Sequence, residues 1–452
     1  MKILFAFENP LPSPQADAEV FLTTARHLAP LASRCWLHVP LPGEAVPAIA
    51  ALAGMAVVRA RAPLRPAALR HLCCGLTLPL RREFREADLV YTRNLWVAWV
   101  ALLFGQRVAF DHYRPWPAQI PPLQFLIHRL LGHRRFLVNI CHSDYTRERY
   151  RSIGVAEDRL RCVRNGFDPA RLQAPVAAGE AKRLLGLDAG RPTVVYTGRL
   201  NHKKGLALVV EAARRLPDHL FLLVGSHGEG PIEAMARDVA NIRVVGWQPA
   251  ETLGRYIFAA DVLLIPPSWK PLAEFGSTVL PLKLFLYMAS GRPVLAGDTP
   301  DIREVLRHGA NAVLCRPDDP EALVAGLGAL ARDPALAARL AAAAQDDSRN
   351  HTWNARAHTI ADLLAARLPE ARLPEARLPE ARLPEARRHP AQARRVGWSR
   401  AQYAAWMRQS WRWLAHLVRA RSWVLPPGPD SSFAPLPEAA IPRRLVPGAA
   451  GD

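Results

Sequence analysis

The stretch VVYTGRLNHKKG (residues 194–205) contains the pattern that decides the fold class. Its first residues are β-branched or aromatic, which predicts a buried strand that ends near Tyr196. Gly198 permits a tight turn, and an amphipathic helical pattern follows over residues 205–215. A buried strand that leads through a short loop into a helix is the repeating unit of parallel α/β sheets.

The same alternation extends in both directions from this stretch. Strand-like runs upstream of it lie at residues 3–7, 35–39, 56–58, 89–91, 107–110 and 136–140. A second series lies at residues 193–196, 220–224, 242–245, 262–265, 293–295 and 312–315. The two series predict two doubly wound, Rossmann-like α/β domains, over residues 1–165 and 166–350.

The character of the chain changes after residue 365. Four tandem copies of ARLPE occupy residues 366–385, and their regular prolines predict an extended linker over residues 366–395. Residues 396–424 combine tryptophan with arginine, without acids after Ser399, in a pattern typical of an amphipathic helix. Residues 425–452 are rich in proline, glycine and alanine and are predicted to be disordered.

The 452-residue chain has 59 Lys and Arg against 40 Asp and Glu, which gives a formal charge of +19. Such an excess favours an anionic partner, which could be a nucleic acid, an anionic membrane or a phosphorylated substrate. Because 53 of the cations are arginine, GC-rich coding is an alternative cause of the excess. The charged residues show no base-reading motif in the α/β part, so we do not expect nucleic-acid binding.

Cysteine spacing and hydropathy restrict the cellular setting. The six cysteines form no C-x-x-C or Cys/His cluster, which indicates reduced thiols and predicts no zinc site. The N-terminal apolar run is too short for a signal peptide, and no stretch reaches the roughly 18 apolar residues that a spanning helix needs. These features predict a cytoplasmic protein that meets a membrane only peripherally, on its inner face.

The loop after the strand at 193–196 carries the residues best suited to an anionic ligand. Arg199 and Lys204 are cations that precede a helix N-terminus, and such an arrangement suits a diphosphate. The alternative is an ordinary solvated loop. The glycine-rich segment LLVGSHGEG (residues 222–230), which contains Gly225, follows the next strand and allows close approach of the backbone to a nucleotide.

An ordered series of further motifs follows these two loops. They are IRVVGW (242–247), AADVLLIPPS (259–268), PLKLFLYMASGRPVLA (281–296), EVLRHGANAVLCRPDDPEAL (304–323) and HTWNARA (351–357). Over residues 191–366 the chain resembles the nucleotide-binding half of the family 4 glycosyltransferases, which have the GT-B fold. The segments VYTRNLWVAWVAL (90–102), VAFDHYRP (108–115), NICHSDYTRERY (139–150) and VRNGFDPARL (163–172) resemble the acceptor half more loosely.

The resemblance implies transfer of a sugar, with retention at the anomeric carbon, from a nucleotide-diphosphate donor to a polysaccharide, lipid-linked or other glycan acceptor. It implies no metal, and it places six residues at the donor, Gly198, Arg199, Lys204, Gly225, Lys283 and Leu286. It also implies that a helix over residues 351–365 crosses back to the first domain. His112 and Glu274 are the predicted catalytic residues. The alternative for His112 is a structural histidine at a strand end.

Two departures from the family pattern open a second hypothesis. The glutamate that holds the donor ribose in the family is replaced by Leu286. The first acid of the family's Glu-x7-Glu pair would fall at Thr278, and the nearest acid, Glu274, lies four residues upstream of that position. The N-terminal loop SPQADAE (13–19) lacks the glycines that the family often has near the donor phosphate. The alternative function is therefore a catalytically silent scaffold in the assembly of a cell-surface polysaccharide. The basic, tryptophan-rich segment 396–424 predicts an additional partner, an anionic membrane surface. The alternative is a helix that docks on the protein's own surface.

Overall fold

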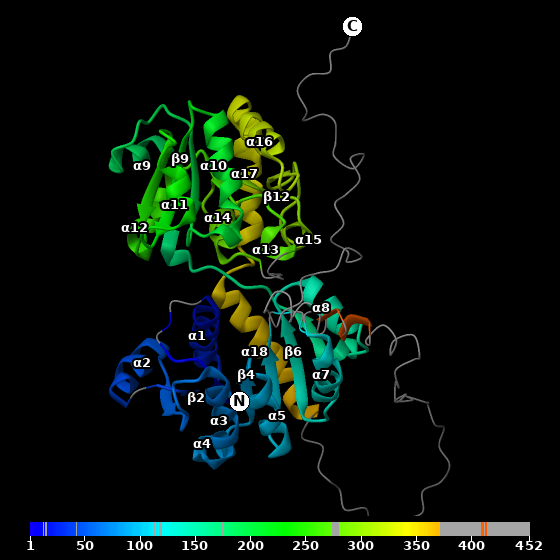
Figure 1. Ribbon diagram of the computed structural model, residues 1–452. Coiled ribbons are helices and arrows are strands. Elements are labelled where there is room, and N and C mark those ends of the chain that lie inside the picture. The colour runs from blue at the N-terminus through cyan, green and yellow to red at the C-terminus, as the bar shows by residue number, and fades with distance from the viewer. Residues whose placement is uncertain are drawn as a thin grey trace, which may run out of the picture.

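The computed structural model describes residues 1–11, 13, 16–41, 43–112, 114, 116, 120–172, 175–273, 280–370, 408–410 and 412–413. Two α/β halves are stacked on one another, and the half that contains the N-terminus is the lower one in Figure 1. Each half is built on a sheet in which all paired strands are parallel. The two predicted Rossmann-like sheets are thus confirmed.

The first sheet has the strand order β3-β2-β1-β4-β5-β6-β7. Its strands are β1 (Lys2–Ala6), β2 (Arg34–Val39), β3 (Ala56–Arg59), β4 (Leu89–Thr92), β5 (Val108–Asp111), β6 (Phe136–Cys141) and β7 (Leu160–Cys162). The order reverses between β1 and β4, and ligands of doubly wound sheets bind beyond the carboxyl ends of the strands at such a point.

The second sheet has the order β10-β9-β8-β11-β12-β13 and reverses between β8 and β11. Its strands are β8 (Thr193–Thr197), β9 (Leu220–Ser226), β10 (Ile242–Gly246), β11 (Val262–Leu264), β12 (Val294–Gly297) and β13 (Val313–Cys315). The stretch that begins at Val194 therefore forms the central strand β8 and the loop at the reversal point.

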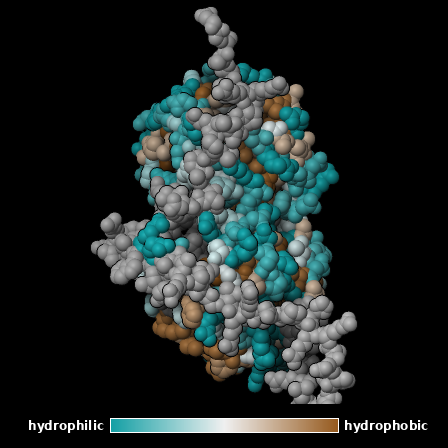
Figure 2. All heavy atoms as spheres, turned by 90° about the vertical axis from the view of Figure 1, so that its right-hand side faces the viewer, coloured by the Kyte–Doolittle hydropathy of each residue, from teal (hydrophilic) through white to brown (hydrophobic). Residues whose placement is uncertain are grey.

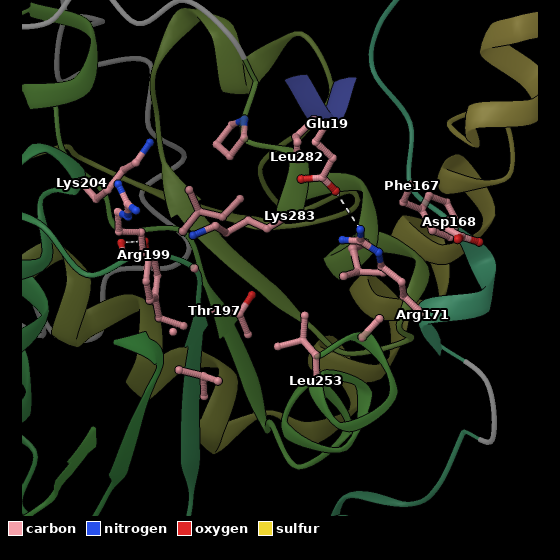
Figure 3. A pocket seen from close by; sticks show the side chains of 18 of the residues that line it. Glu19, Phe167, Asp168, Arg171, Thr197, Arg199, Lys204, Leu253, Leu282 and Lys283 are labelled. Carbon is pink, nitrogen blue, oxygen red and sulfur yellow. Dashed lines mark hydrogen bonds and ion pairs between the residues drawn. The ribbon is translucent and has the colours of Figure 1, made fainter. Parts of the chain in front are cut away.

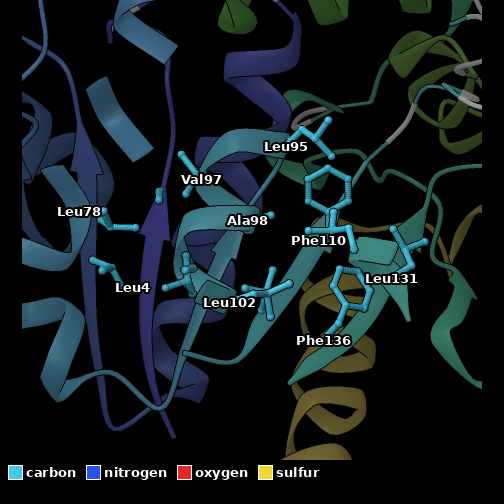
Figure 4. Packing of buried hydrophobic residues seen from close by; sticks show 14 of the residues in the cluster. Leu4, Leu78, Leu95, Val97, Ala98, Leu102, Phe110, Leu131 and Phe136 are labelled. Atoms are coloured by element: carbon cyan, nitrogen blue, oxygen red, sulfur yellow. The ribbon is translucent and has the colours of Figure 1, made fainter. Parts of the chain in front are cut away.

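Helices cover both faces of each sheet. In the first half, α3 (Ala67–Thr77), α5 (Leu95–Leu103), α7 (Gln124–Leu131) and α8 (Asp144–Arg151) share one hydrophobic cluster, whereas α1 (Ala16–Leu28) and α2 (Val46–Ala53) belong to the other. The short helix α4 (Arg82–Glu86) and the 3-10 turn η3 (Leu78–Leu80) lie between α3 and β4. Figure 4 shows the first cluster, in which Leu78, Val97, Ala98 and Leu102 pack toward Leu4 of the sheet.

The second half has the same layered arrangement. Its helices are α9 (Ala178–Leu184), α10 (Leu206–Arg215), α11 (Pro231–Ala236), α12 (Ala250–Phe258), α13 (Lys270–Ala273), α14 (Leu282–Ala289), α15 (Pro300–Arg303), α16 (Pro320–Arg332) and α17 (Pro334–Ser348). The 3-10 turns η6 (Pro169–Leu172) and η7 (His202–Lys204) lie on the loops that lead into this half and into α10. Helices α10 and α16 pack on one face of the sheet, and α12 and α14 pack on the other.

Helix α18 (Trp353–Glu370) begins next to the second half and ends in the first. Its residues Ala357, Ile360, Leu364 and Leu368 are buried in the cluster that contains β1 and α1. The predicted crossover helix was expected over residues 351–365, and the helix continues through the first ARLPE copy to Glu370. Of the predicted segments 366–395, 396–424 and 425–452, almost everything beyond Glu370 lies outside the described residues.

None of the helices that the structure describes is both long and apolar enough to span a lipid bilayer.

Candidate functional site

A cavity of about 900 Å³ lies between the two halves. The first half contributes residues of α1, and the second half contributes the loops that follow β8, β9, β11 and β12 together with the start of α14. The lining includes all six residues that the sequence places at the donor, which are Gly198, Arg199, Lys204, Gly225, Lys283 and Leu286. The carboxyl ends of the second sheet's strands thus form one wall of an interdomain cleft.

Two glycines allow backbone segments to meet in this wall. Gly198 and Gly225 have φ values of +123° and +117°, which few other residues adopt. A Cβ atom on Gly225 would lie 2.7 Å from the carbonyl oxygen of Gly198, and one on Gly198 would lie 2.8 Å from Nζ of Lys283. Larger side chains at these positions would therefore displace the β8 loop or the lysine.

Three cations gather beside these glycines. Figure 3 shows Arg199, Lys204 and Lys283 on one side of the cavity. The Lys283 ammonium lies 3.6 Å from the centroid of the Tyr196 ring, a cation–π contact that holds it in place. The cluster offers a concentrated positive charge to an anion in the cavity.

Desolvation lowers the pKa of both lysines in this cluster. Desolvation, followed by repulsion from Lys204, holds the pKa of Lys283 well below its usual range. Lys204 is exposed at the cavity edge, and partial desolvation there, followed by repulsion from Lys203, lowers its pKa. An anion bound between the ammonium groups would offset both effects, since an opposite charge favours the protonated form.

The loop between β8 and α10 is fixed by a close contact. Gly205 has a φ of +71° at the N-cap of α10, and a Cβ there would lie 2.3 Å from Cβ of Ser268. Ser268 is in turn held by a hydrogen bond of 2.6 Å from its hydroxyl to Asp318. Glycine at 205 therefore brings Lys204 to the cavity edge.

Leu286, for which the resemblance predicted a ribose-binding glutamate, lies in the cavity wall. Its side chain is only 5% exposed and lines the cavity from α14. The next residue fixes this helix against β8, because the Tyr287 hydroxyl accepts a hydrogen bond of 2.7 Å from the amide of Thr197. The wall at this position is apolar.

The opposite wall carries an ion pair that joins the two halves. Glu19 of α1 accepts a hydrogen bond of 2.7 Å from Arg171 of η6, and both side chains are about two-fifths exposed. Figure 3 shows this pair across the cavity from the three cations. Glu19 belongs to the glycine-free N-terminal segment, so a carboxylate lies on the side where the family often has glycines.

Asp301 and Thr299 are polar lining residues that the sequence did not single out. The Thr299 hydroxyl donates a hydrogen bond of 2.6 Å to Asp301, whose side chain is 8% exposed, and burial raises the pKa of this carboxyl group. The sequence GDTPDIREVL does not indicate that these two residues line a cavity, because Thr-Pro-Asp is typical of any helix N-terminus.

His112 lies in a buried network behind the end of β5, outside the described lining of the cavity. Its Nδ1 atom is 2.9 Å from the Tyr150 hydroxyl and 3.0 Å from the carbonyl oxygen of Arg114. Desolvation, with Arg93 and Arg114 nearby, holds its pKa well below the usual range. These contacts agree with the structural alternative for His112, and a role at the sugar stays a prediction. Glu274 lies outside the described residues.

The residue before His112 forms a buried ionic cluster that sequence reasoning missed. Asp111 lies 2.6 Å from Nε2 of His142 and accepts hydrogen bonds of 3.0 Å at both oxygens from Arg356 of α18. Burial disfavours the charged carboxylate, but Arg356 and His142 outweigh it and hold the pKa of Asp111 well below its usual range. Arg356 follows Asp111 by 245 positions, so no local pattern reveals the pair.

One group of side chains in the described part of the chain could in principle ligate a metal. The ligand atoms of Asp144, Cys162 and Glu304 lie within 4.8 Å of one another. However, the Arg164 guanidinium donates hydrogen bonds to both carboxylates, and burial raises the pKa of the Cys162 thiol to about 12. The arrangement therefore fits an ion-pair network better than a cation site.

Comparisons with protein-family models match both halves of the chain. A model described as "Glycosyltransferase Family 4" matches residues 18–171, and one described as "Glycosyl transferases group 1" matches residues 191–333. A D-inositol 3-phosphate glycosyltransferase of Xylanimonas cellulosilytica is 31% identical over 229 residues, which are 48% of this chain and 53% of the relative. A phosphatidyl-myo-inositol mannosyltransferase of Mycolicibacterium smegmatis is 28% identical over 229 residues, which are 49% and 55% of the two chains.

The chain spans about half the length of the curated relatives it matches. Among solved structures, Alr3699/HepE of Anabaena in complex with UDP-glucose superimposes with a TM-score of 0.63 at 19% identity, over 81% of this chain and all of that one. WaaG, a glycosyltransferase involved in lipopolysaccharide biosynthesis, superimposes with a TM-score of 0.57 at 14% identity, over 80% and 99% of the chains. At these identities the superpositions show the fold.

Proposed function

Because the chain belongs to the family 4 glycosyltransferases of GT-B fold, we propose that it transfers a sugar from a nucleotide-diphosphate donor, with retention, to a glycan or lipid-linked acceptor. The observation that carries this proposal is the cluster of Arg199, Lys204 and Lys283 beside Gly198 and Gly225 in the interdomain cavity. Fixed cations next to exposed backbone suit a diphosphate better than they suit a neutral sugar.

The three cations would act mainly on the leaving group. As the bond between the anomeric carbon and the diphosphate oxygen breaks, negative charge grows on the diphosphate, and charges already in place stabilise it without reorganisation. The departing phosphate can take the proton of the acceptor hydroxyl, so this route needs no strong general base and no metal. His112 and Glu274 remain our proposed residues near the reacting sugar.

Named relatives support the choice of substrates. The matched proteins include glycosyltransferases and mannosyltransferases whose names refer to inositol phosphate and phosphatidyl-inositol acceptors, and a matched structure holds UDP-glucose. The acceptor of this chain is therefore proposed only as a class, glycan or lipid-linked.

A donor screen tests the proposal. The full chain is incubated with UDP- and GDP-sugars and candidate acceptors, and released nucleotide is measured, followed by NMR of the anomeric proton of the product. We expect one donor to release nucleotide in an acceptor-dependent way and to give a product with the donor's anomeric configuration. A product of inverted configuration would contradict retention.

The apolar wall at Leu286 favours a second candidate, a catalytically silent scaffold for polysaccharide assembly. Loss of a carboxylate that hydrogen-bonds a ribose costs about 1.5–3 kcal/mol of donor binding, which weakens but does not forbid it. A scaffold of this kind would bind none of the UDP- or GDP-sugars, whereas a weakened enzyme would bind one of them.

We also propose that residues 396–424 hold the protein against the inner face of an anionic membrane, with residues 366–395 as a spacer. The support is the sequence, since arginine and tryptophan alternate there without acids after Ser399. Deletion of residues 386–452 is expected to reduce co-sedimentation with anionic vesicles. Unchanged co-sedimentation would refute this role.

A further inference from the structure

Helices α3 and α5 are apolar on the side that faces away from the sheet as well as on the side that packs against it. On α3, Leu69, Leu72 and Leu76 recur at helical spacing and are 46%, 40% and 55% exposed. On the inner side of the same helix Cys74 is fully buried. A surface helix of a soluble domain normally places polar residues on its outer side.

Helix α5 and the turn η3 continue this surface. Leu80 of η3 is 72% exposed, and on α5 Trp96 is 49% and Leu103 is 74% exposed, with Phe104 at its C-terminus at 64%. The sequence LWVAWVALL of α5 contains no charged or polar side chain apart from the tryptophan indoles. Figure 2 shows hydrophobic side chains gathered at the lower end of the molecule, where the first half lies.

These residues lie on three elements that adjoin one another, and we call the exposed apolar residues together the α3–α5 face. Helices α3 and α5 cover the same side of the first sheet and pack closely, since a Cβ on Gly75 of α3 would lie 3.3 Å from the Trp96 backbone. Their outer sides therefore point in one direction. Contiguous exposed apolar patches of this extent mark sites of contact with a protein or a membrane.

The charge around the face favours an anionic partner. Residues 59–143, which include α3, η3 and α5, contain 13 arginines and only four acids, Glu83, Glu86, Asp88 and Asp111. Asp111 is fully buried, and Glu86 is paired with Arg82. A second copy of this chain would bring the same positive charge against itself, and the basic segment 396–424 would do likewise, so neither fits as the occupant.

From these observations we infer that the α3–α5 face binds an anionic lipid bilayer, with the leucines and aromatic rings at the level of the acyl chains and the arginines at the phosphates. This surface is separate from residues 396–424. Its Trp96 end lies toward the cavity, whereas Leu103 and Phe104 lie at the other end of α5. Trp96 lies four residues after the carboxyl end of β4, and this end is paired with the end of β1 at the cavity side of the sheet.

The test uses the full chain and vesicles of phosphatidylcholine with or without phosphatidylglycerol. The variant Leu76→Glu/Leu103→Glu/Phe104→Glu places carboxylates on the exposed face, and Leu184→Glu/Met235→Glu/Val244→Glu is the matched control on exposed apolar positions of the second half. We expect binding to anionic vesicles to weaken by at least about tenfold in the first variant and to stay unchanged in the control. Equal melting temperatures for both variants would show that the fold is intact.

A second measurement reports on the α3–α5 face directly and does not depend on residues 396–424. Lipids brominated on their acyl chains quench tryptophans that enter the bilayer, and the difference in quenching between the wild type and Trp96→Phe reports on Trp96. We expect that difference to be clear with anionic vesicles and absent without them. The inference is overturned if Trp96 is not quenched, if the glutamate variant binds vesicles as the wild type does, or if it instead changes from a dimer to a monomer in light scattering.

Discussion

The contact between Gly198 and Lys283 shows at single-residue scale how the cavity acquires its charge. Gly198 leaves room for Nζ of Lys283, which a Cβ at that position would approach to 2.8 Å. The ring of Tyr196 lies beneath the ammonium group. One turn residue and one aromatic residue of the stretch 194–205 thus place a cation that comes from α14.

Lys204→Ala is expected to weaken donor binding about 10- to 100-fold, because one charge-assisted hydrogen bond to the diphosphate would be lost. The readout is the donor KM and kcat in the nucleotide-release assay. Lys203→Ala is the matched control, since Lys203 is adjacent in the chain but is not part of the described cavity lining. Wild-type kinetics for Lys204→Ala would remove this residue from the donor site.

We expect Lys283 to make donor affinity depend on pH. Its pKa is held well below the usual range, and only the protonated ammonium attracts the diphosphate. Affinity should therefore fall as pH rises through this lowered pKa, in a range where ordinary lysines remain charged. Donor affinity measured across pH 6–10 should fall with pH in the wild type. In Lys283→Met, the affinity should be weaker throughout and should change less with pH. Parallel profiles in the two proteins would mean that Lys283 does not respond to the donor.

Site residues that belong to a local sequence motif could be predicted, whereas residues placed by tertiary packing could not. Arg199 and Lys204 lie in the loop after β8, and Gly225 lies near the end of β9, so their local motifs together with the family resemblance placed them at the cavity wall. The sequence did not predict that Asp301 lines the cavity, since this position results from the packing of α15 at the cleft. The assignment of His112 to the reacting sugar drew on its position after β5, which cannot distinguish a ring in the cleft from one bonded to Tyr150.

At the scale of elements, the buried strands were predictable and the edge strand β7 was not. All 12 strand-like runs became strands. Continuous apolar runs are typical of strands covered on both faces, and the runs of β3 and β10 were also recognised although these two strands lie at sheet edges and are partly exposed. The segment Leu160–Cys162 has an exposed Arg161 at its centre and lies at the sheet edge, so its apolar pattern is interrupted. The extension of α18 to Glu370 was also missed, because its buried Leu364 and Leu368 are recognised only against the first half.

Helix α18 is fixed to the first half by Arg356, whose side chain is 1% exposed. Arg356→Met would leave Asp111 buried with only His142 and Tyr91 as partners, so we expect a loss of about 3–5 kcal/mol in the free energy of unfolding. Denaturant unfolding of the first half measures this loss. The double variant Asp111→Asn/Arg356→Met should recover part of it, and strictly additive losses would contradict direct coupling.

At the scale of the whole molecule, Glu304 links the two halves next to the cavity. This residue follows α15 in the second half and accepts hydrogen bonds of 2.8 and 2.9 Å from the amides of Asp144 and Tyr145, at the start of α8 in the first half. Arg164 donates a further bond of 3.2 Å to it. The carboxylate thus meets helix amides, a favourable place for a negative charge.

Glu304→Ala is expected to loosen the arrangement of the halves, because two helix amides lose their acceptor and the Arg164 guanidinium keeps only Asp144. Small-angle X-ray scattering should then give a broader distance distribution and a larger radius of gyration than for the wild type. Asp347→Ala is the control, since Asp347 bonds Arg307 and Asn311 within the second half. Identical scattering for Glu304→Ala and the wild type would show that this contact does not hold the halves together.

Isothermal titration of the full chain with UDP- and GDP-sugars tests the central claim, that the cation-lined cavity binds a nucleotide-diphosphate donor. We expect saturable binding of at least one donor by the wild type and by Lys203→Ala, and affinity at least about tenfold weaker for Lys204→Ala. Binding of no donor by the wild type, or equal affinity in all three proteins, would contradict the account.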